Sequence, residues 1–166
     1  MGEDSSTVDG KSRRARVVAR NYTLLAMAAG AVPLPGVSAA IICINASMIG
    51  HIAAIYGREA ISYEKVLGAL GVAGLVNIGG RAMFVEILRF VASFGVQWWS
   101  LPLVCGVGSL TAGAQTWILG SVGTAVAESQ RELTRDEVRK RVEEAKGTFG
   151  EIADADRRGE RGKGDE

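Results

Sequence analysis

Residues 108–124 read GSLTAGAQTWILGSVGT, and this stretch decides the fold that we expect. Small side chains recur in it at every fourth position: Gly108, Ala112, Thr116, Gly120 and Thr124. Residues at spacing four lie on one side of a helix, and small ones let a second helix backbone approach closely. The stretch therefore predicts a helix-packing face on a long helix, which we place at Leu103–Ala127.

Two long tracts of the chain contain no charged residue. Asp, Glu, Lys and Arg are absent from residues 21–57 and from residues 90–127. A helix of about 20 apolar residues, rising about 1.5 Å per residue, matches the roughly 30 Å hydrocarbon core of a bilayer. We therefore predict two membrane-spanning helices, Ser38–Tyr56 and Leu103–Ala127, in an all-α protein.

The first uncharged tract contains a break and a second packing pattern. Proline lacks an N–H and restricts the residue before it, so a helix starting near Lys11 must end before the predicted turn, formed by Pro33, Pro35 and Gly36. The helix after the turn also carries small residues at spacing four: Ala46, Gly50 and Ala54. We predict that these three residues pack against another helix.

Basic residues directly precede the first uncharged tract. Residues 11–20 contain five basic groups and no acidic one, and we assign four of them to lipid headgroups: Arg13, Arg14, Arg16 and Arg20. The positive-inside rule places this segment in the cytoplasm. The net charge of the whole chain is only +1, so we expect no nucleic-acid partner.

Polar residues inside the uncharged tracts are few. His51 is the only histidine, and we expect it to form an interhelical hydrogen bond, as do Asn45 and Asn77. A single histidine without a neighbouring Asp, Glu or Cys cannot form a metal site. Glycine-rich stretches lack the strand–loop–helix context of a phosphate loop. We therefore expect no catalytic residue, cofactor or metal.

The C-terminal part is charged and amphipathic. Thr134 followed by Glu137 is a capping box, which starts a helix. The helix carries one apolar stripe, which we expect to be uncovered and to bind a partner: Val138, Val142, Ala145 and Phe149. Between the two spans, residues 63–97 are expected to form a helical hairpin partly buried against them.

These patterns divide the chain into four parts. We expect a disordered N-terminus (residues 1–10), a membrane-associated helical domain (11–127), a cytoplasmic amphipathic helix (128–150) and a disordered tail (151–166). The fold class is thus all-α, with membrane-associated helical hairpins and a C-terminal amphipathic helix.

The chain resembles the YcjF-like bacterial membrane domains in two features. One is the segment Val32-Pro33-Leu34-Pro35-Gly36-Val37-Ser38, and the other is the apolar helix that follows it and ends in Tyr56-Gly57. The resemblance covers about residues 17–127. A weaker similarity links the turn to the C-terminal helical domain of immunity-related GTPases. The YcjF-like family implies a helical, membrane-associated module that serves a GTPase in trans, and it implies no catalytic residues.

Three functions remain open at this point. The first is a non-enzymatic integral membrane adaptor or scaffold in the bacterial cytoplasmic (inner) membrane. It would have both termini in the cytoplasm, membrane lipid and a protein partner as ligands, and a homo-oligomeric state. The second is a self-assembling pore or membrane-remodelling protein built on the glycine stripe. The third is a soluble helical bundle, because uncharged apolar helices also form the cores of soluble proteins.

Overall fold

The computed structural model describes residues 5–32, 36–58, 61, 63–71, 83, 87, 101–129, 131 and 133–161. This part of the chain is helical with short turns and contains no strand, which confirms the all-α prediction. The helices are α1 (Ser5–Gly30), α2 (Val37–Ile55), α4 (Leu101–Glu128) and α5 (Arg135–Arg161). Residues 63–71 form a further helical segment.

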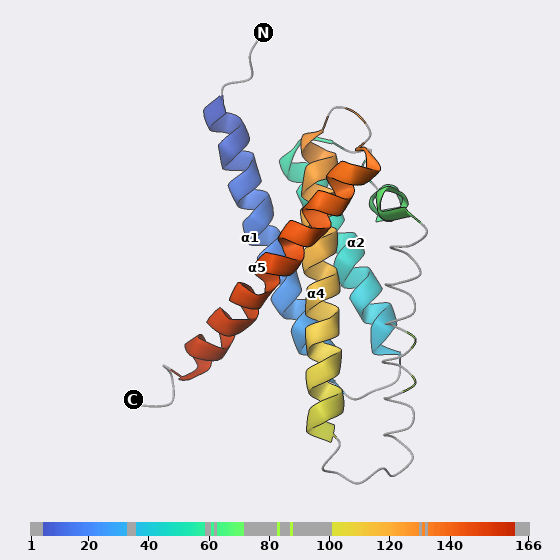
Figure 1. Cartoon of the computed structure of the whole chain (residues 1–166), viewed down its shortest axis with the longest axis vertical. Helices are drawn as coiled ribbons and strands as arrows, with labels where there is room; N and C mark the ends of the chain where they lie inside the picture. The colour runs from blue at the N-terminus through green and yellow to red at the C-terminus, as the bar shows by residue number, and fades with distance from the viewer. Residues whose placement is uncertain are drawn as a thin grey trace.

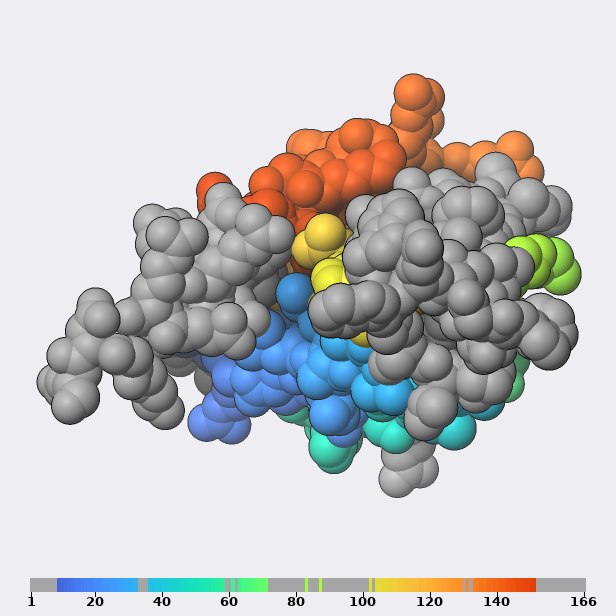
Figure 2. Space-filling model, turned by 90° about the horizontal axis from the view of Figure 1, so that it is seen from below, coloured from blue at the N-terminus to red at the C-terminus, as the bar shows by residue number. Residues whose placement is uncertain are grey.

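Helix α4 lies at the centre of the arrangement (Figure 1) and packs against α1, α2 and α5. In Figure 2, α5 lies on one side of the molecule and α1 with α2 on the opposite side, with α4 visible between them. The helices therefore form three layers, and the charged α5 and the uncharged α2 belong to opposite outer layers.

Helix α1 packs on α4 through a face of small residues that the sequence analysis did not identify. This face is buried and consists of Ala15, Ala19, Thr23, Ala26 and Gly30. Its spacing of four, four, three and four is the signal that could have revealed it. The helix begins at Ser5, whereas the sequence analysis expected a disordered N-terminus over residues 1–10.

The break between α1 and α2 lies where the sequence predicted it. Gly36 precedes α2 with a φ of +85°, a left-handed conformation that favours glycine, while Pro33 and Pro35 lie outside the described residues. Helix α2 ends in a Schellman motif, in which the backbone N–H groups of Gly57 and Arg58 donate to the carbonyls of Ala54 and Ala53.

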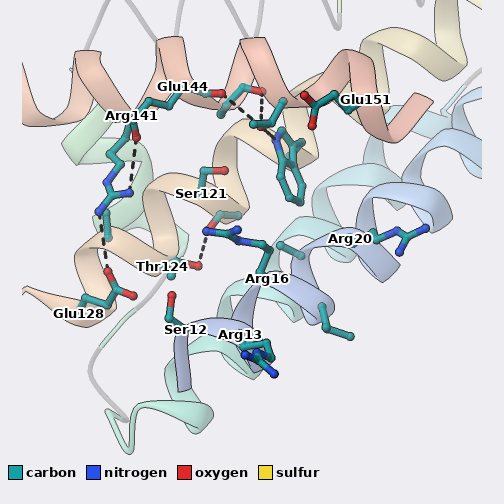
Figure 3. Close-up of a pocket in the computed structure, with 17 residues that line it drawn as sticks. Ser12, Arg13, Arg16, Arg20, Ser121, Thr124, Glu128, Arg141, Glu144 and Glu151 are labelled. Carbon is teal, nitrogen blue, oxygen red and sulfur yellow. Dashed lines mark hydrogen bonds and ion pairs between the residues drawn. The ribbon is translucent and has the colours of Figure 1, made fainter. Parts of the chain in front are cut away.

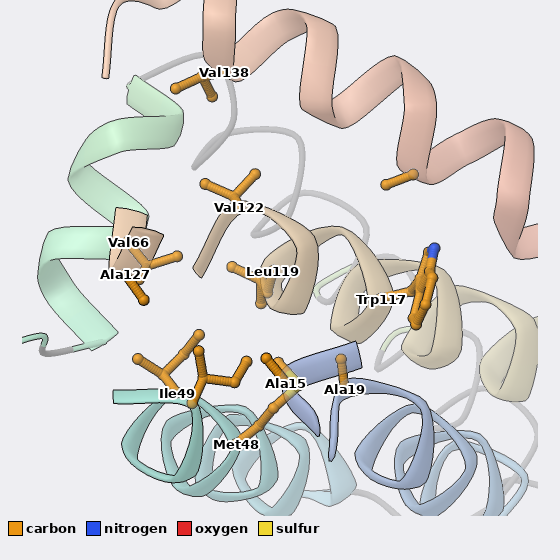
Figure 4. Packing of buried hydrophobic residues seen from close by; sticks show 12 residues of the cluster. Ala15, Ala19, Met48, Ile49, Val66, Trp117, Leu119, Val122, Ala127 and Val138 are labelled. Carbon is orange, nitrogen blue, oxygen red and sulfur yellow. The ribbon is translucent and has the colours of Figure 1, made fainter. Parts of the chain in front are cut away.

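Large apolar side chains fill the space between α2, α4 and the segment 63–71. The largest fully buried ones are Met48, Ile49 and Ile52 of α2, Leu119 and Val122 of α4, and Val66. Figure 4 shows Met48 and Ile49 pointing toward Leu119, with Ala15 and Ala19 of α1 beside them. These contacts fix which side of α2 faces inward.

Within the described residues, one helix is long and apolar enough to cross a membrane, namely α2, and 28% of its span-length window is buried in the molecule. Helix α4 has the length but not the apolarity, because its stripe of Gly, Ala, Thr and Ser lowers its hydropathy. The prediction of a second span at Leu103–Ala127 is therefore not met. Helix α4 is instead the central helix of the fold.

Two further boundaries differ from the prediction. Helix α5 continues to Arg161, whereas the sequence analysis expected a disordered tail over residues 151–166. Of the predicted hairpin, the segment 63–71 and the single residues 83 and 87 are helical, and the rest lies outside the described part of the chain.

Candidate functional site

The small-residue stripe of α4 contacts α1 and α2 within the same chain. A Cβ on Gly30 of α1 would lie 2.5 Å from the carbonyl oxygen of Gly108 and 2.8 Å from Cβ of Ala112. A Cβ on Gly120 would lie 2.8 Å from Cβ of Ala19. Distances under 3.0 Å leave no room for a side chain, so these helices approach each other as closely as glycine allows.

The corresponding stripe of α2 lies on the opposite side from the core. Ala46, Gly50 and Ala54 are exposed, and no atom lies within 4 Å of a Cβ built on Gly50. They pack against no other described helix, which differs from the prediction. Burial of the larger side chains Met48, Ile49 and Ile52 stabilises the fold more than burial of alanine or glycine would. The large side chains therefore face the core, and the small residues face outward.

The exposed side chains of α2 form one surface without Asp, Glu, Lys or Arg, which we call the outer face of α2. It comprises Ala39, Ala40, Ile42, Cys43, Ala46, Ser47, Gly50, His51 and Ala54. Ile42 is 53% exposed, the largest apolar exposure on this face. A helix that exposes so much apolar surface marks a contact with lipid or with another protein.

Two hydrogen bonds join α2 to its neighbours, as predicted for His51 and Asn45. Tyr22 Oη of α1 lies 2.8 Å from Nδ1 of His51, with the two rings edge to face. Thr116 Oγ1 of α4 donates to Oδ1 of the buried Asn45 at 2.8 Å. Asn77 lies outside the described residues. Both observed bonds connect α2 to a neighbouring helix.

The apolar stripe of α5 is covered by the rest of the chain. Val138 and Ala145 are buried in the main core, and Val142 and Phe149 pack against it. The expectation of an uncovered stripe is therefore wrong. A 27-residue amphipathic helix buries its apolar face wherever a partner surface is available, and α4 supplies that surface here.

The capping box at the start of α5 has the expected geometry. The Thr134 backbone N–H donates to Oε2 of Glu137 at 2.8 Å, and the Glu137 backbone N–H donates to Oγ1 of Thr134 at 3.4 Å. Arg131 also donates to both carboxylate oxygens of Glu137, at 3.0 and 2.5 Å. These bonds, chiefly those from Arg131, lower the pKa of Glu137 to about 2.

Polar contacts join the C-terminal ends of α2 and α4. Tyr56 Oη donates to Oε1 of Glu128 at 2.9 Å, and the Arg58 guanidinium donates to the carbonyl of Ser129 at 2.6 Å. Partial burial and the neighbouring carboxylate raise the pKa of Tyr56. At the other end of the bundle, Gly30 meets Gly108, so charges gather at one end of α1, α2 and α4.

A groove of about 740 Å³ lies between α1, α4 and α5, and we call it the α1–α4–α5 groove (Figure 3). Its size is within the range of about 300–1,000 Å³ that is usual for ligand pockets. Apolar residues that line it include Val17, Ala19, Trp117, Ala125 and Ala145. The indole of Trp117 donates from Nε1 to Oγ1 of Thr148 at 3.0 Å, which fixes the ring at the groove wall.

Charged residues from three helices, α1, α4 and α5, line this groove. Arg13, Arg16 and Arg20 of α1 line it, whereas Arg14 does not. The opposite side has carboxylates that the sequence analysis missed: Glu128, Glu144 and Glu151. Arg141, Glu144, Thr148 and Glu151 are spaced three, four and three residues apart, and this spacing on one flank of α5 could have indicated the site.

One ion-pair cluster closes one end of the groove. Arg141 lies 3.9 Å from Glu128 and 3.5 Å from Glu144, measured between side-chain nitrogen and oxygen atoms. Among the described side chains, Arg13, Arg16, Arg20 and Glu151 form no ion pair. The groove therefore combines an internally neutralised end with a cationic wall whose charges are available to a ligand.

Comparison with known proteins gives no relative from which a function could be transferred. No family model, no curated protein and no solved structure matches the chain. Two surfaces of the chain itself can indicate a function, namely the outer face of α2 and the α1–α4–α5 groove.

Proposed function

We propose that the chain is a non-enzymatic integral membrane adaptor or scaffold that contacts lipid through the outer face of α2. The observation that supports this proposal is the exposure of a helix of span length, since only 28% of its span-length window is buried. Nineteen residues correspond to about 28 Å of helix, close to the roughly 30 Å hydrocarbon thickness.

The distribution of charge supports the same function. The outer face of α2 contains no Asp, Glu, Lys or Arg, whereas the charged α5 lies in the opposite outer layer. A membrane protein places its charged surface away from the hydrocarbon, because a charge at the bilayer centre costs about 2.5–3.5 kcal/mol or more. In this arrangement α4 lies between α2, which would contact lipid, and the charged α5.

The proposal includes a location and an orientation. The charged ends of α1, α2 and α4 would lie on the cytoplasmic side of a bacterial inner membrane, which leaves both termini in the cytoplasm, and α5 would lie along α4 on the side away from α2. Arg14 is exposed outside the groove and is suited to anionic lipid headgroups. A GTPase partner in trans rests on the family resemblance alone, and it would meet the outer, charged side of α5.

We also expect a homo-oligomer, for which the outer face of α2 is the suitable surface. The rival pore, built on Gly108, Ala112, Thr116 and Gly120, loses its geometric basis because these residues contact α1 and α2 of their own chain.

A soluble bundle is the second candidate. The soluble bundle is favoured by the finding that one described helix has the length and apolarity of a membrane span. In a soluble bundle, the outer face of α2 would dock on a partner protein.

A matched pair of lysine substitutions tests the lipid contact. Gly50 of α2 and Gly147 of α5 are both exposed helical glycines with no atom within 4 Å of a built Cβ, so lysine fits at either position without a clash. Lysine also has a better helix propensity than glycine by about 0.5–1 kcal/mol, so neither variant should unfold.

We expect Gly50→Lys to shift the full-length chain from the membrane pellet toward the soluble fraction, since a charge near the bilayer centre costs up to about 2.5–3.5 kcal/mol. Gly147→Lys should fractionate like the unmodified chain. Alkaline extraction and sedimentation of isolated membranes measure both. Equal fractionation of the two variants, or recovery of the unmodified chain as a monodisperse species in detergent-free buffer, would contradict the proposal.

A further inference from the structure

We propose that the α1–α4–α5 groove binds a phosphate ester that also carries an ammonium group, the chemistry of a phosphoethanolamine headgroup. Both kinds of charge in such a ligand have a counterpart in the groove. The phosphate would contact the arginines of α1, and the ammonium would contact Glu151 of α5.

The α1 wall supplies guanidinium groups for the phosphate. Arg13, Arg16 and Arg20 are spaced by three and four residues, so they share one side of the helix, and all three line the groove. None forms an ion pair with another described side chain. Like charges at this spacing repel, and a bound phosphate would relieve the repulsion through charge-assisted hydrogen bonds.

The α5 wall supplies one carboxylate for the ammonium. Arg141 neutralises Glu128 and Glu144 at one end of the groove, whereas Glu151 has no ion pair within the described chain. Figure 3 shows Glu151 and Arg20 toward the other end of the groove, on opposite walls. Two opposite charges that line one cavity without meeting fit a ligand that carries both charges.

The floor between the walls suits the ester backbone. Arg16 extends from α1 toward Ser121 and Thr124 of α4 in Figure 3, which places a cation in the middle of the groove. Val17, Trp117 and Ala145 line the same cavity and offer apolar surface to a glycerol or acyl group. The volume of about 740 Å³ accommodates a ligand of this class.

Two sources share this chemistry, a phosphatidylethanolamine headgroup and a soluble phosphoethanolamine ester. Binding of the lipid headgroup rests on the proposed membrane function, whereas binding of the soluble ester does not. The experiment therefore has one arm with a soluble ester and one arm with vesicles.

The soluble arm uses the fluorescence of Trp117. The chain contains three tryptophans, so the full-length Trp98→Phe/Trp99→Phe variant reports on the groove alone. This protein is titrated with glycerophosphoethanolamine and, separately, with glycerol 3-phosphate. We expect both esters to change the emission, with tighter binding of the ester that carries the ammonium.

Charge-removing substitutions with matched controls locate the site. Arg16→Gln should raise the Kd of both esters about tenfold, as expected for the loss of one charge-assisted hydrogen bond, whereas Arg14→Gln, outside the groove on the same helix, should leave it unchanged. Glu151→Gln should abolish the preference for glycerophosphoethanolamine. Asp136→Asn, an exposed carboxylate of α5 outside the groove, should preserve it.

Three outcomes would overturn the inference: no emission change with either ester, equal effects of Arg16→Gln and Arg14→Gln, or an unchanged preference in Glu151→Gln. The vesicle arm compares sedimentation with phosphatidylethanolamine-containing and pure phosphatidylcholine vesicles. Ester binding without sedimentation supports the groove and contradicts the proposed membrane function. Sedimentation that is identical for both lipids and for Arg16→Gln, without ester binding, contradicts the groove and supports the membrane function.

Discussion

Helices α2 and α4 share a sequence pattern but differ in their surroundings. Both are uncharged over their apolar length and both carry small residues at spacing four. A Cβ built on Gly120 of α4 would lie 2.8 Å from Cβ of Ala19, whereas no described atom lies within 4 Å of a Cβ built on Gly50 of α2. Helix α4 has neighbours on three sides, so its small face meets another backbone. Helix α2 lies at the edge, and its larger side chains occupy the inner side. Small-residue spacing thus permits close packing but does not determine where it occurs.

The largest effect is expected where the small residues of α1 and α4 meet. A Cβ at Gly30 would lie 2.5 Å from the backbone oxygen of Gly108, and backbone atoms cannot rotate away as a side chain can. Gly30→Val should therefore destabilise the fold by about 3 kcal/mol, the upper end of the usual range for overpacking. Thermal unfolding in a fixed buffer or detergent measures the loss as a lower Tm.

Gly50→Val is the matched control for this substitution. Its Cβ has no neighbour within 4 Å, and valine has a better helix propensity than glycine, so the Tm should stay the same or rise slightly. A similar fall in Tm for both variants would show that the two helices do not differ in packing as described.

The hydrogen bond between α2 and α4 should have an intermediate effect. Thr116→Val removes the donor to the buried Oδ1 of Asn45 and should destabilise the fold by about 1–2 kcal/mol, because a buried acceptor loses its partner. Thr124→Val is a suitable comparison, since the Thr124 hydroxyl bonds only within α4, to the Gly120 carbonyl. Chemical denaturation should show the larger loss for Thr116→Val, and equal losses would contradict an interhelical role.

The smallest effect concerns the charged layer and depends on pH. The pKa of Glu137 is lowered from its ordinary value near 4.5 to about 2, so its bonds stabilise the start of α5 fully above about pH 4.5. This stabilisation should decrease as the pH falls from about 4.5 through 2, because the unfolded state binds the proton more tightly.

Amide hydrogen exchange at the start of α5 measures this change, and NMR titration of the Glu137 carboxyl measures the pKa directly. Arg131→Gln should raise the pKa of Glu137 toward its ordinary value and move the fraying of the helix to higher pH. A wild-type carboxyl that titrates near pH 4.5 would show that the Arg131 contact does not persist in solution.

Sequence patterns that depend on a few neighbouring residues were good guides to this fold. The capping box at Thr134 and Glu137 starts α5. Helix α1 ends at Gly30 and α2 begins at Val37, so the helical structure is interrupted at the predicted turn. The hydrogen-bonding roles of His51 and Asn45 were also predicted correctly, because a polar group among apolar helices requires a partner. Each of these features is decided by chemistry within one or two turns of chain.

Features that depend on distant segments were not predictable in the same way. The stripe containing Val138 and Phe149 identifies an apolar side of α5, but only the folded chain shows that α4 covers it. The three carboxylates of the groove come from two helices, and their positions opposite Arg16 follow from the crossing of α5 over α1 and α4.

By itself, the sequence determined the helical class, the central break, the cap of α5 and the segregation of charge along the chain. The tertiary structure alone decided that α4 is interior, that the outer face of α2 is exposed and that a groove forms beside Trp117. The physical reason is that helix signals arise from backbone geometry and local hydrogen bonds, whereas burial depends on which of several similar apolar faces gains the most contact area.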